Sequence, residues 1–276
     1  MAASSVLRIA FVGGGNMARS LIGALLRDGA PRDSIRVGEP FDATRQALAA
    51  DFGIHAESSG AAAVTEADVV VLAIKPQLMA EVCADLAPVL IARRPLIVSI
   101  AAGITLQQID GWLGGGYPVV RSMPNTPALI GAGASGLIAN AAVTAKQRSQ
   151  AAAILGAAGR TAWIDDEAQM DVVTALSGSG PAYFFLLIEA LEDAATARGL
   201  PRDTARRLAI QTCLGAALMA DASEESPAQL RQRVTSPGGT TQAALDAFAA
   251  GDFRSLVDAA VAAAATRGAE LSAELG

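Results

Sequence analysis

A short glycine-rich sequence from Gly13 to Ala18 constrains the fold of this chain more than any other feature. It has the pattern Gly-x-Gly-x-x-Ala and joins a largely apolar run, Val6–Val12, to a helical pattern over Asn16–Arg27. A sharp strand-to-helix turn requires small residues: Gly13 permits the turn, Gly15 lets the backbone approach a diphosphate, and Ala18 lets the helix lie close to the sheet. The N–H groups at the helix start favour an anion. The pattern predicts a strand–helix–strand unit that binds a dinucleotide.

An acidic residue stands where such a unit would meet the adenosine ribose. Glu39 follows the expected strand Ile35–Val37 and lies 26 residues after Gly13. A carboxylate there can accept hydrogen bonds from the ribose diol and would repel a 2′-phosphate, so we expect NADH to be used at least comparably to NADPH. Arg45 complicates this expectation, because its guanidinium could neutralise the repulsion by swinging across the ribose.

Apolar runs and helical patterns alternate along residues 1–165, which we assign to a dinucleotide-binding domain. The alternation predicts an α/β fold with a doubly wound, Rossmann-type sheet and helices on both faces. Strands are expected at Val6–Val12, Ile35–Val37, near His55, and at Val69–Ile74, Leu96–Ile100, Val119–Ser122, Ala134–Ile138 and Thr161–Ile164, the last two with uncertain pairing. Intervening helices are expected at Asn16–Arg27, Ala43–Phe52, Gln77–Leu86, Thr105–Leu113 and Thr144–Leu155.

Residues 166–276 show helical patterns only, which we assign to an all-helical dimerisation and substrate domain. Helices are expected at about Gln169–Leu176, Pro181–Arg198, Arg202–Asp221, Pro227–Arg233, Thr241–Ala250 and Ser255–Leu275. These helices offer more apolar surface than one small layer can bury. We therefore expect a homodimer as the minimal folded unit, with a larger assembly left open.

Charge, cysteine content and hydropathy narrow the class of protein. The net charge of −6 argues against a nucleic-acid partner, because a phosphate backbone needs a basic face. Cys83 and Cys213, the only cysteines, lie in apolar helical patterns and are expected to be core thiols, with no metal site. Met1–Leu7 lacks a secretion-signal pattern, and prolines interrupt the longest uncharged stretch, Ser122–Ala145. We expect a cytoplasmic protein with no membrane partner.

Ligands of a doubly wound sheet lie beyond the carboxyl ends of its strands, so the segments that follow the strands are binding candidates. Lys75-Pro76 would place a cation near phosphate or ribose, unless the lysine is merely solvated before a helix. The small residues of Ser99–Gly103 would let a flat nicotinamide ring lie against backbone. Met123–Pro127 is a rigid polar turn that either contributes to the site or only stiffens its loop.

The helical half contains two further glycine-rich segments, Ser177–Pro181 and Ser236–Thr241, each of which resembles the start of a helix. Pro181 suits a first helical turn, and Ser179 suits a cap. Free N–H groups at such starts can bind a carboxylate, whereas the alternative is helix capping alone. Two such segments beside a nucleotide domain favour carboxylate binding.

The chain lacks the positioned proton donors that ketone-reducing dehydrogenases need. Neither Tyr117 nor Tyr183 is followed four residues later by lysine, no lysine follows Lys146, and the single histidine, His55, falls early in the nucleotide domain. A cyclic imine is basic enough to arrive protonated, and its iminium carbon accepts hydride without a strong protein acid. The missing acids therefore indicate an imine substrate.

Six motifs, in order and at matching intervals over residues 7–271, resemble those of pyrroline-5-carboxylate reductases. They are GGGNMA (Gly13–Ala18), AIKP (Ala73–Pro76), VSIAAG (Val98–Gly103), RSMPNTP (Arg121–Pro127), LSGSGPAY (Leu176–Tyr183) and SPGGTT (Ser236–Thr241). The resemblance implies hydride transfer from NADPH or NADH to 1-pyrroline-5-carboxylate, which gives L-proline in the last step of proline biosynthesis. It also implies an intertwined dimer, which some members assemble into larger rings.

The same resemblance implies where the ligands bind. With Glu39, the cofactor-binding residues would be Val12, Gly13, Gly14, Gly15, Asn16, Met17, Ala73, Ile74, Lys75, Pro76 and Ala101. The substrate-binding residues would be Ser236, Gly238, Gly239, Thr240 and Thr241. We expect Thr241 to be catalytic by hydrogen-bonding the ring nitrogen, the alternative being that it caps a helix. Glu39-Pro40 departs from the Ser or Arg often found in NADPH-preferring relatives, which leaves cofactor preference open.

Two functions of other classes compete with imine reduction. A two-domain hydroxyacid dehydrogenase would need a lysine in the helical domain, which this chain lacks. A non-enzymatic nucleotide-binding sensor would turn over no imine. Turnover with an imine and with hydroxyacids therefore separates the three.

Overall fold

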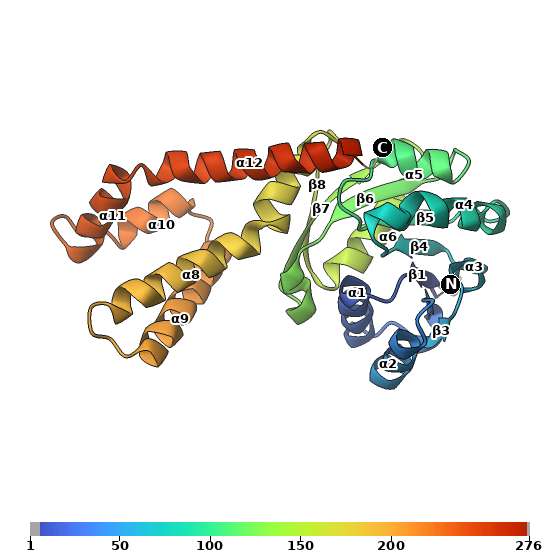
Figure 1. Ribbon diagram of the computed structural model, residues 1–276, viewed down its shortest axis with the longest axis horizontal. Coiled ribbons are helices and arrows are strands. Elements are labelled where there is room, and N and C mark those ends of the chain that lie inside the picture. Colours follow the sequence, from blue (N-terminus) through green and yellow to red (C-terminus); the bar gives the residue numbers. More distant parts are fainter. Residues whose placement is uncertain (1–5, 275–276) are drawn as a thin grey trace. The chain divides into compact units, whose positions relative to one another are not determined.

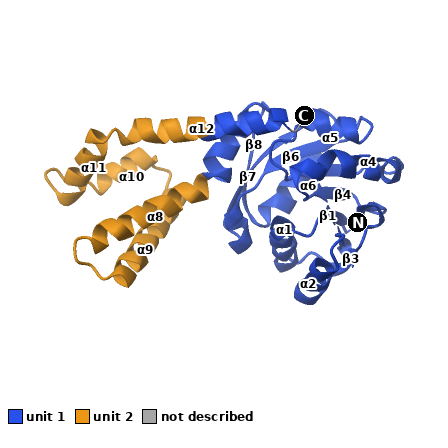
Figure 2. Ribbon diagram, viewed as in Figure 1, with its two compact units in different colours: residues 1–179, 264–276 blue, residues 180–263 orange. Residues whose placement is uncertain are grey.

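The computed structural model describes residues 6–274, which form two compact units (Figure 2). One unit contains the chain up to Ser179 together with the residues from Ala264 onward, and the other contains Gly180–Ala263. Met1–Ser5, and with them most of the segment on which the secretion-signal prediction depends, lie outside the described residues.

An eight-stranded sheet forms the centre of the first unit (Figure 1). Its strands are β1 (Ile9–Val12), β2 (Ile35–Gly38), β3 (His55–Glu57), β4 (Val69–Leu72), β5 (Leu96–Ser99), β6 (Val119–Met123), β7 (Gly133–Ala139) and β8 (Gly159–Trp163). They lie in the order β3-β2-β1-β4-β5-β6-β7-β8, and all neighbours are parallel except β6 and β7. The chain switches direction across the sheet between β1 and β4, which confirms the doubly wound fold.

The antiparallel pairing of β6 and β7 follows from the short connection between them. The segment between Met123 and Gly133 holds only a 3-10 turn, η3 (Thr126–Ile130). A parallel pair needs a crossover of a dozen or more residues. The pairing left uncertain by the sequence is therefore decided by the length of this connection.

Helices cover both faces of the sheet. One face carries α1 (Asn16–Arg27), α2 (Asp42–Phe52) and α6 (Ala145–Gly156), and the other carries α3 (Gly60–Val64), α4 (Met79–Leu90) and α5 (Leu106–Trp112). Two 3-10 turns, η1 (Arg32–Ser34) and η2 (Pro76–Leu78), complete the connections. Phe11 and Val12 pack into opposite cores, so the central strands are buried on both sides and their sequences are continuous apolar runs.

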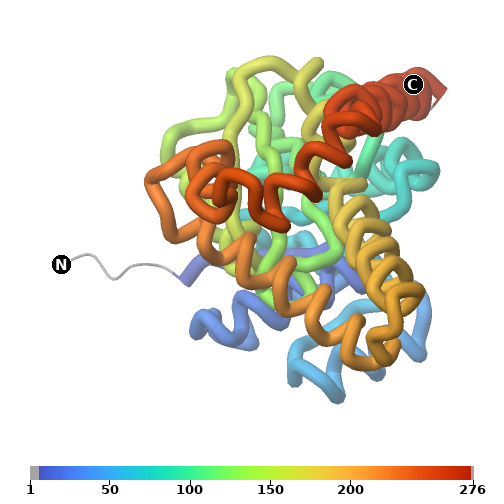
Figure 3. The backbone as a smooth tube through the Cα atoms, turned by 90° about the vertical axis from the view of Figure 1, so that its left-hand side faces the viewer, coloured from blue at the N-terminus to red at the C-terminus, as the bar shows by residue number. Residues whose placement is uncertain are grey.

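The later helices match their expected ranges to within three residues. They are α7 (Gln169–Val173), α8 (Gly180–Thr196), α9 (Arg202–Asp221), α10 (Pro227–Arg233), α11 (Thr240–Ala250) and α12 (Phe253–Glu274), with a π-helical turn, η4 (Thr174–Gly178), between α7 and α8. The chain reverses between α8 and α9 (Figure 3). Buried Glu192 of α8 accepts hydrogen bonds from Arg202 and Arg206 of α9, which joins the two helices.

Helix α8 presents apolar side chains that a single chain leaves uncovered. Phe184, Phe185 and Leu186 are between 59% and 66% exposed. By length and composition alone, the helical stretch Gln169–Thr196 could cross a membrane. Only 11% of its most apolar segment is buried within the chain. Such a face needs another surface to cover it.

The compact units divide at a different place from the predicted domains. Helix α7 and the π-turn belong with the sheet, because Met170 is buried, Glu167 pairs with Arg121, and the Ser177 carbonyl accepts from Asn125. The sequence boundary after residue 165 instead follows the last strand, which ends at Trp163. The assignment of 166–276 to a separate functional domain stays a prediction.

Candidate active site

The turn between β1 and α1 depends on a different property of each glycine. Gly13 has φ +98°, and a Cβ there would lie 2.4 Å from the carbonyl oxygen of Ala73. Gly15 is the N-cap of α1, and a Cβ there would meet nothing within 4 Å. No side chain caps the helix, so its first N–H groups, from Asn16 and Met17 onward, have neither an intrahelical acceptor nor a capping side chain. This arrangement fits a diphosphate.

Glu39 has a structural role that its sequence position did not reveal. Its carboxylate is buried, with Oε2 accepting from the Gly14 N–H at 2.9 Å and Oε1 accepting from the Phe41 N–H at 3.0 Å. It therefore ties the glycine turn to the loop after β2. Each carboxylate oxygen can still accept a second hydrogen bond, so the ribose role stays a prediction.

Arg45 is held on the same loop. Its Nη1 donates to the carbonyl oxygens of Glu39 and Pro40 at 2.8 and 2.7 Å, and Nη2 pairs with Asp42 at 3.0 Å. These contacts hold the guanidinium against two backbone carbonyls and the Asp42 carboxylate. For the guanidinium to swing across the ribose, as the sequence allowed, these hydrogen bonds would have to break.

The other expected cofactor residues lie at the same edge of the sheet. Ala73 follows β4 and donates its N–H to the Val12 carbonyl at 2.8 Å. Lys75 is exposed just before η2, in which Pro76 is the first residue. Ala101, after β5, is buried. Because β1, β4 and β5 are parallel neighbours, the structure brings Val12–Met17, Ala73–Pro76 and Ala101 to one edge.

The five expected substrate residues meet at the start of α11 in the second unit. Gly238 has φ +70°, and the Gly239 N–H bonds to the Ser236 carbonyl at 3.0 Å. Gly239 is the N-cap, so Thr240 and Thr241 are the first two helical residues. The alternative that Thr241 caps this helix is therefore wrong. The first N–H groups of α11, like those of α1, have no intrahelical acceptor.

The segment Ser177–Pro181 is not the free helix start that the sequence indicated. The Ser179 N–H bonds to the Thr174 carbonyl at 2.8 Å, so α7 continues through the π-turn toward α8. Asn125 braces this turn: its Nδ2 donates to the Ser177 carbonyl and its Oδ1 accepts from the Ala134 N–H, both at 2.9 Å. Of the two free helix starts expected in the helical half, only the one at α11 is present among the described residues.

Other polar groups of the described chain do not converge on a metal or thiol centre. Within residues 6–274 no group of three or more His, Cys, Asp or Glu side chains could hold a metal ion. Burial raises the pKa of the Cys83 thiol to about 12, as suits a core thiol. Cys213 is only partly buried, because a single chain leaves much of α9 exposed. His55 is exposed and contacts Glu57.

Two family models match separate parts of the chain. A model described as pyrroline-5-carboxylate reductase dimerisation matches residues 167–271, and one described as NADP oxidoreductase coenzyme F420-dependent matches residues 8–103. The pyrroline-5-carboxylate reductase of Pseudomonas aeruginosa is 56% identical over 272 residues, covering 99% of each chain.

Solved structures of similar proteins cover nearly the whole chain. A pyrroline-5-carboxylate reductase from Coxiella burnetii matches with a TM-score of 0.94 and 42% identity, covering 97% of this chain and 99% of its own. The Plasmodium falciparum pyrroline carboxylate reductase, solved with NADP bound, matches with a TM-score of 0.83 and 28% identity, covering 96% of this chain and 98% of its own.

Proposed function

The chain belongs to the pyrroline-5-carboxylate reductase family, and we propose that two glycine-capped helix starts divide its reaction between cofactor and substrate. The protein is an NAD(P)H-dependent oxidoreductase that reduces 1-pyrroline-5-carboxylate to L-proline, the last step of proline biosynthesis. The observation that carries the division is that Gly15 and Gly239 stand at the N-caps of α1 and α11, where neither can place a side chain over the helix end.

The start of α1 holds the cofactor diphosphate. Gly15 leaves the approach open, and the N–H groups of Asn16 and Met17 supply the donors. Lys75 and Pro76 border the ribose and phosphates, and Ala101 lies against the nicotinamide ring. The bound cofactor supplies the hydride.

The start of α11 holds the substrate. Backbone N–H groups of residues 238–240 bind its carboxylate, and Ser236 closes the turn that presents them. The ring nitrogen is one bond beyond the carboxylate-bearing carbon, so the hydroxyl of Thr241 can reach it. That hydroxyl accepts from the iminium N–H and donates to the neutral amine nitrogen once hydride has added to the ring carbon. The hydroxyl needs no shifted pKa to do this.

A homodimer formed through residues after about 166 covers the apolar face of α8. Phe184, Phe185 and Leu186 would otherwise face water, and the dimerisation model that matches residues 167–271 spans this face. A protein partner rather than lipid therefore accounts for the apolar stretch Gln169–Thr196. We place this dimer, or a larger assembly of such dimers, in the cytoplasm, without nucleic-acid or membrane partners.

One assay tests the function against its two competitors. NAD(P)H oxidation is followed with pyrroline-5-carboxylate, and NAD(P)⁺ reduction with small hydroxyacids. We expect turnover with the imine alone. Turnover with hydroxyacids would favour a dehydrogenase of that class. A folded protein that binds cofactor but reduces no imine would be a nucleotide sensor, and the proposal would be wrong.

A further inference from the structure

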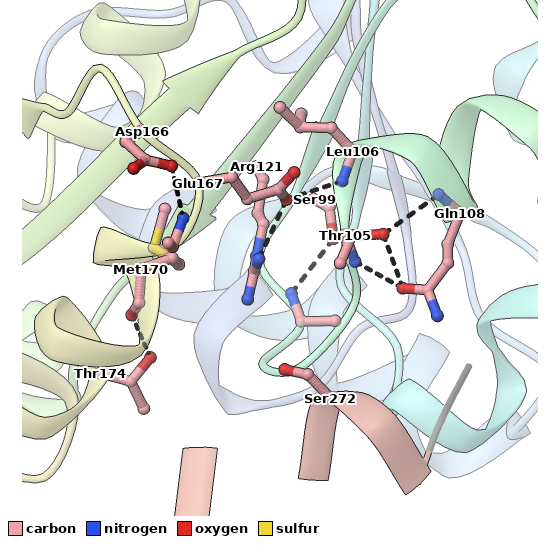
Figure 4. Close-up of polar contacts among 12 residues, drawn as sticks. Ser99, Thr105, Leu106, Gln108, Arg121, Asp166, Glu167, Met170, Thr174 and Ser272 are labelled. Atoms are coloured by element: carbon pink, nitrogen blue, oxygen red, sulfur yellow. Dashed lines mark hydrogen bonds and ion pairs between the residues drawn. The ribbon is translucent and has the colours of Figure 1, made fainter. Parts of the chain in front are cut away.

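Arg121 is a buried cation that the chemistry proposed above does not use. It lies on β6 with its side chain 4% exposed, and it is the single cation among the buried charged residues of the described chain, beside Glu39 and Glu192. Burying an unpaired charge is costly. Its guanidinium Nη1 donates to Glu167 Oε1 at 3.0 Å, a partner 46 residues further along the chain (Figure 4).

The same oxygen of Glu167 also holds the start of α5. Oε1 accepts the N–H of Leu106 at 2.8 Å, and Leu106 is the first residue of that helix. Thr105, the N-cap, forms a capping box with Gln108, so residues of the helix itself also stabilise its start. Glu167 therefore joins β6, α5 and the chain that leads into α7 at one atom.

This junction anchors the far end of the loop that carries Ala101. The loop leaves β5 at Ser99, whose Oγ accepts the Ala101 N–H at 3.3 Å and whose carbonyl accepts from Ser122 Oγ at 2.9 Å. The near end of the loop is thus bonded to β6 through Ser122, and the far end is bonded to β6 through Arg121 and Glu167.

We propose that Glu167 is a positioning residue for hydride transfer, which fixes the loop of residues 100–105 against the nicotinamide half of the cofactor. The inference rests on the proposed function, since the placement of the nicotinamide at Ala101 belongs to it. Glu167 touches neither substrate nor cofactor and acts through the N–H of Leu106 and the charge of Arg121. The adenosine half meets other residues, around the glycine turn and Glu39.

Because the proposal concerns only the nicotinamide half of the cofactor, the experiment compares ligands with and without that half. Glu167→Ala and Glu167→Gln are compared with wild type in kcat, KM for both substrates, and affinity for NAD(P)H and for ADP-ribose, which lacks the nicotinamide. We expect kcat to fall about 10- to 100-fold in the alanine variant, because a misplacement of about 1 Å has this effect on a transfer step. NAD(P)H affinity should fall a few-fold and ADP-ribose affinity should stay within about twofold. Glutamine keeps an acceptor for Leu106 and should recover part of kcat.

Asp68 provides a matched control at the opposite ends of the strands. Its carboxylate accepts from the backbone N–H of Arg8 at 3.0 Å and pairs with the guanidiniums of Arg8 and Arg93. Asp68 directly precedes β4, away from the edge where the cofactor loops lie. Asp68→Asn should lower the melting temperature and leave kcat and NAD(P)H affinity near wild type.

The outcomes separate three cases. Wild-type kcat in a folded Glu167→Ala variant, or equal losses of ADP-ribose and NAD(P)H affinity, would overturn the positioning role. If the alanine variant does not fold, as a missing thermal unfolding transition would show, its affinities are set aside, and wild-type kcat in Glu167→Gln would overturn the role. Failure of the wild type itself to reduce the imine would instead refute the proposed function, and the comparison of NAD(P)H with ADP-ribose would still test the loop.

Discussion

Replacing Gly13 or Gly15 by alanine separates two roles of glycine in the β1–α1 turn. At Gly13, φ is +98° and an added Cβ would lie 2.4 Å from the Ala73 carbonyl oxygen. That backbone cannot easily move, because the Ala73 N–H is bonded to the Val12 carbonyl at 2.8 Å. At Gly15, φ is −69° and an added Cβ would meet no atom within 4 Å.

These geometries predict opposite effects. Strained backbone costs about 1–3 kcal/mol, and the overlap adds about 1–3 kcal/mol. Gly13→Ala should therefore lower the free energy of unfolding by about 2–6 kcal/mol and Tm by about 10 °C. Gly15→Ala exchanges a good N-cap for a poorer one, which costs about 1 kcal/mol. Its methyl group, however, stands where the diphosphate approaches, so NAD(P)H affinity should fall at least about 10-fold.

Thermal unfolding and equilibrium titration with NAD(P)H, measured on both variants and wild type, test this pair. Each variant is the other's control, because both add one methyl group to the same turn. Wild-type stability of Gly13→Ala would refute the steric argument. Wild-type cofactor affinity in a folded Gly15→Ala would show that the diphosphate does not approach there.

Four further predictions concern the site and its support. Glu39→Gln should shift the ratio of kcat/KM values toward NADPH. It also deprives either Gly14 or Phe41 of a hydrogen-bond acceptor, which should lower the free energy of unfolding by about 1–3 kcal/mol. A strong NADPH preference that the substitution leaves unchanged would exclude the ribose role. Thr241→Val should lower kcat/KM by about 10- to 1,000-fold with little loss of cofactor affinity, whereas normal turnover would show that the hydroxyl is dispensable. The hydrogen bond from Arg206 lowers the pKa of the Glu192 carboxyl; burial opposes this shift and Arg202 adds to it. The ionised carboxylate therefore stabilises the folded protein above its ordinary pKa of about 4.3, and this contribution is lost as the pH falls through the lower pKa of the folded state. In urea unfolding the advantage of wild type over Glu192→Gln should thus shrink below about pH 4.3, and a pH-independent difference would contradict this. Light scattering on dilution should find a dimer as the smallest active species, which a stable, active monomer would contradict.

Local sequence was sufficient for most of the fold and for the position of the cofactor turn. The apolar runs of β1 and β4 and the helical patterns of α9 and α10 depend on the period of side chains along one element. The ranges of the two helices were predicted to the residue, whereas β1 begins three residues later and β4 ends two residues earlier than predicted. Gly13 and Gly15 could be identified from the sequence because a tight turn between consecutive elements requires small residues at neighbouring positions. The motif at Ser236–Thr241 located the start of α11 for the same reason.

Sequence patterns failed where a residue depends on a distant part of the chain. Ser177–Pro181 has the composition of a helix start, but its first two residues belong to a π-turn, in which the Ser177 carbonyl accepts from Asn125, 52 residues away. The structural role of Glu39 was missed: its bond from the nearby Phe41 N–H is local, but its bond from the Gly14 N–H exists only once β1 and β2 lie side by side. Arg121 and Glu167 find each other only when α7 packs on the sheet. A buried charge takes the partner that folding brings within hydrogen-bonding distance, and nothing in the residues beside it specifies which partner that is.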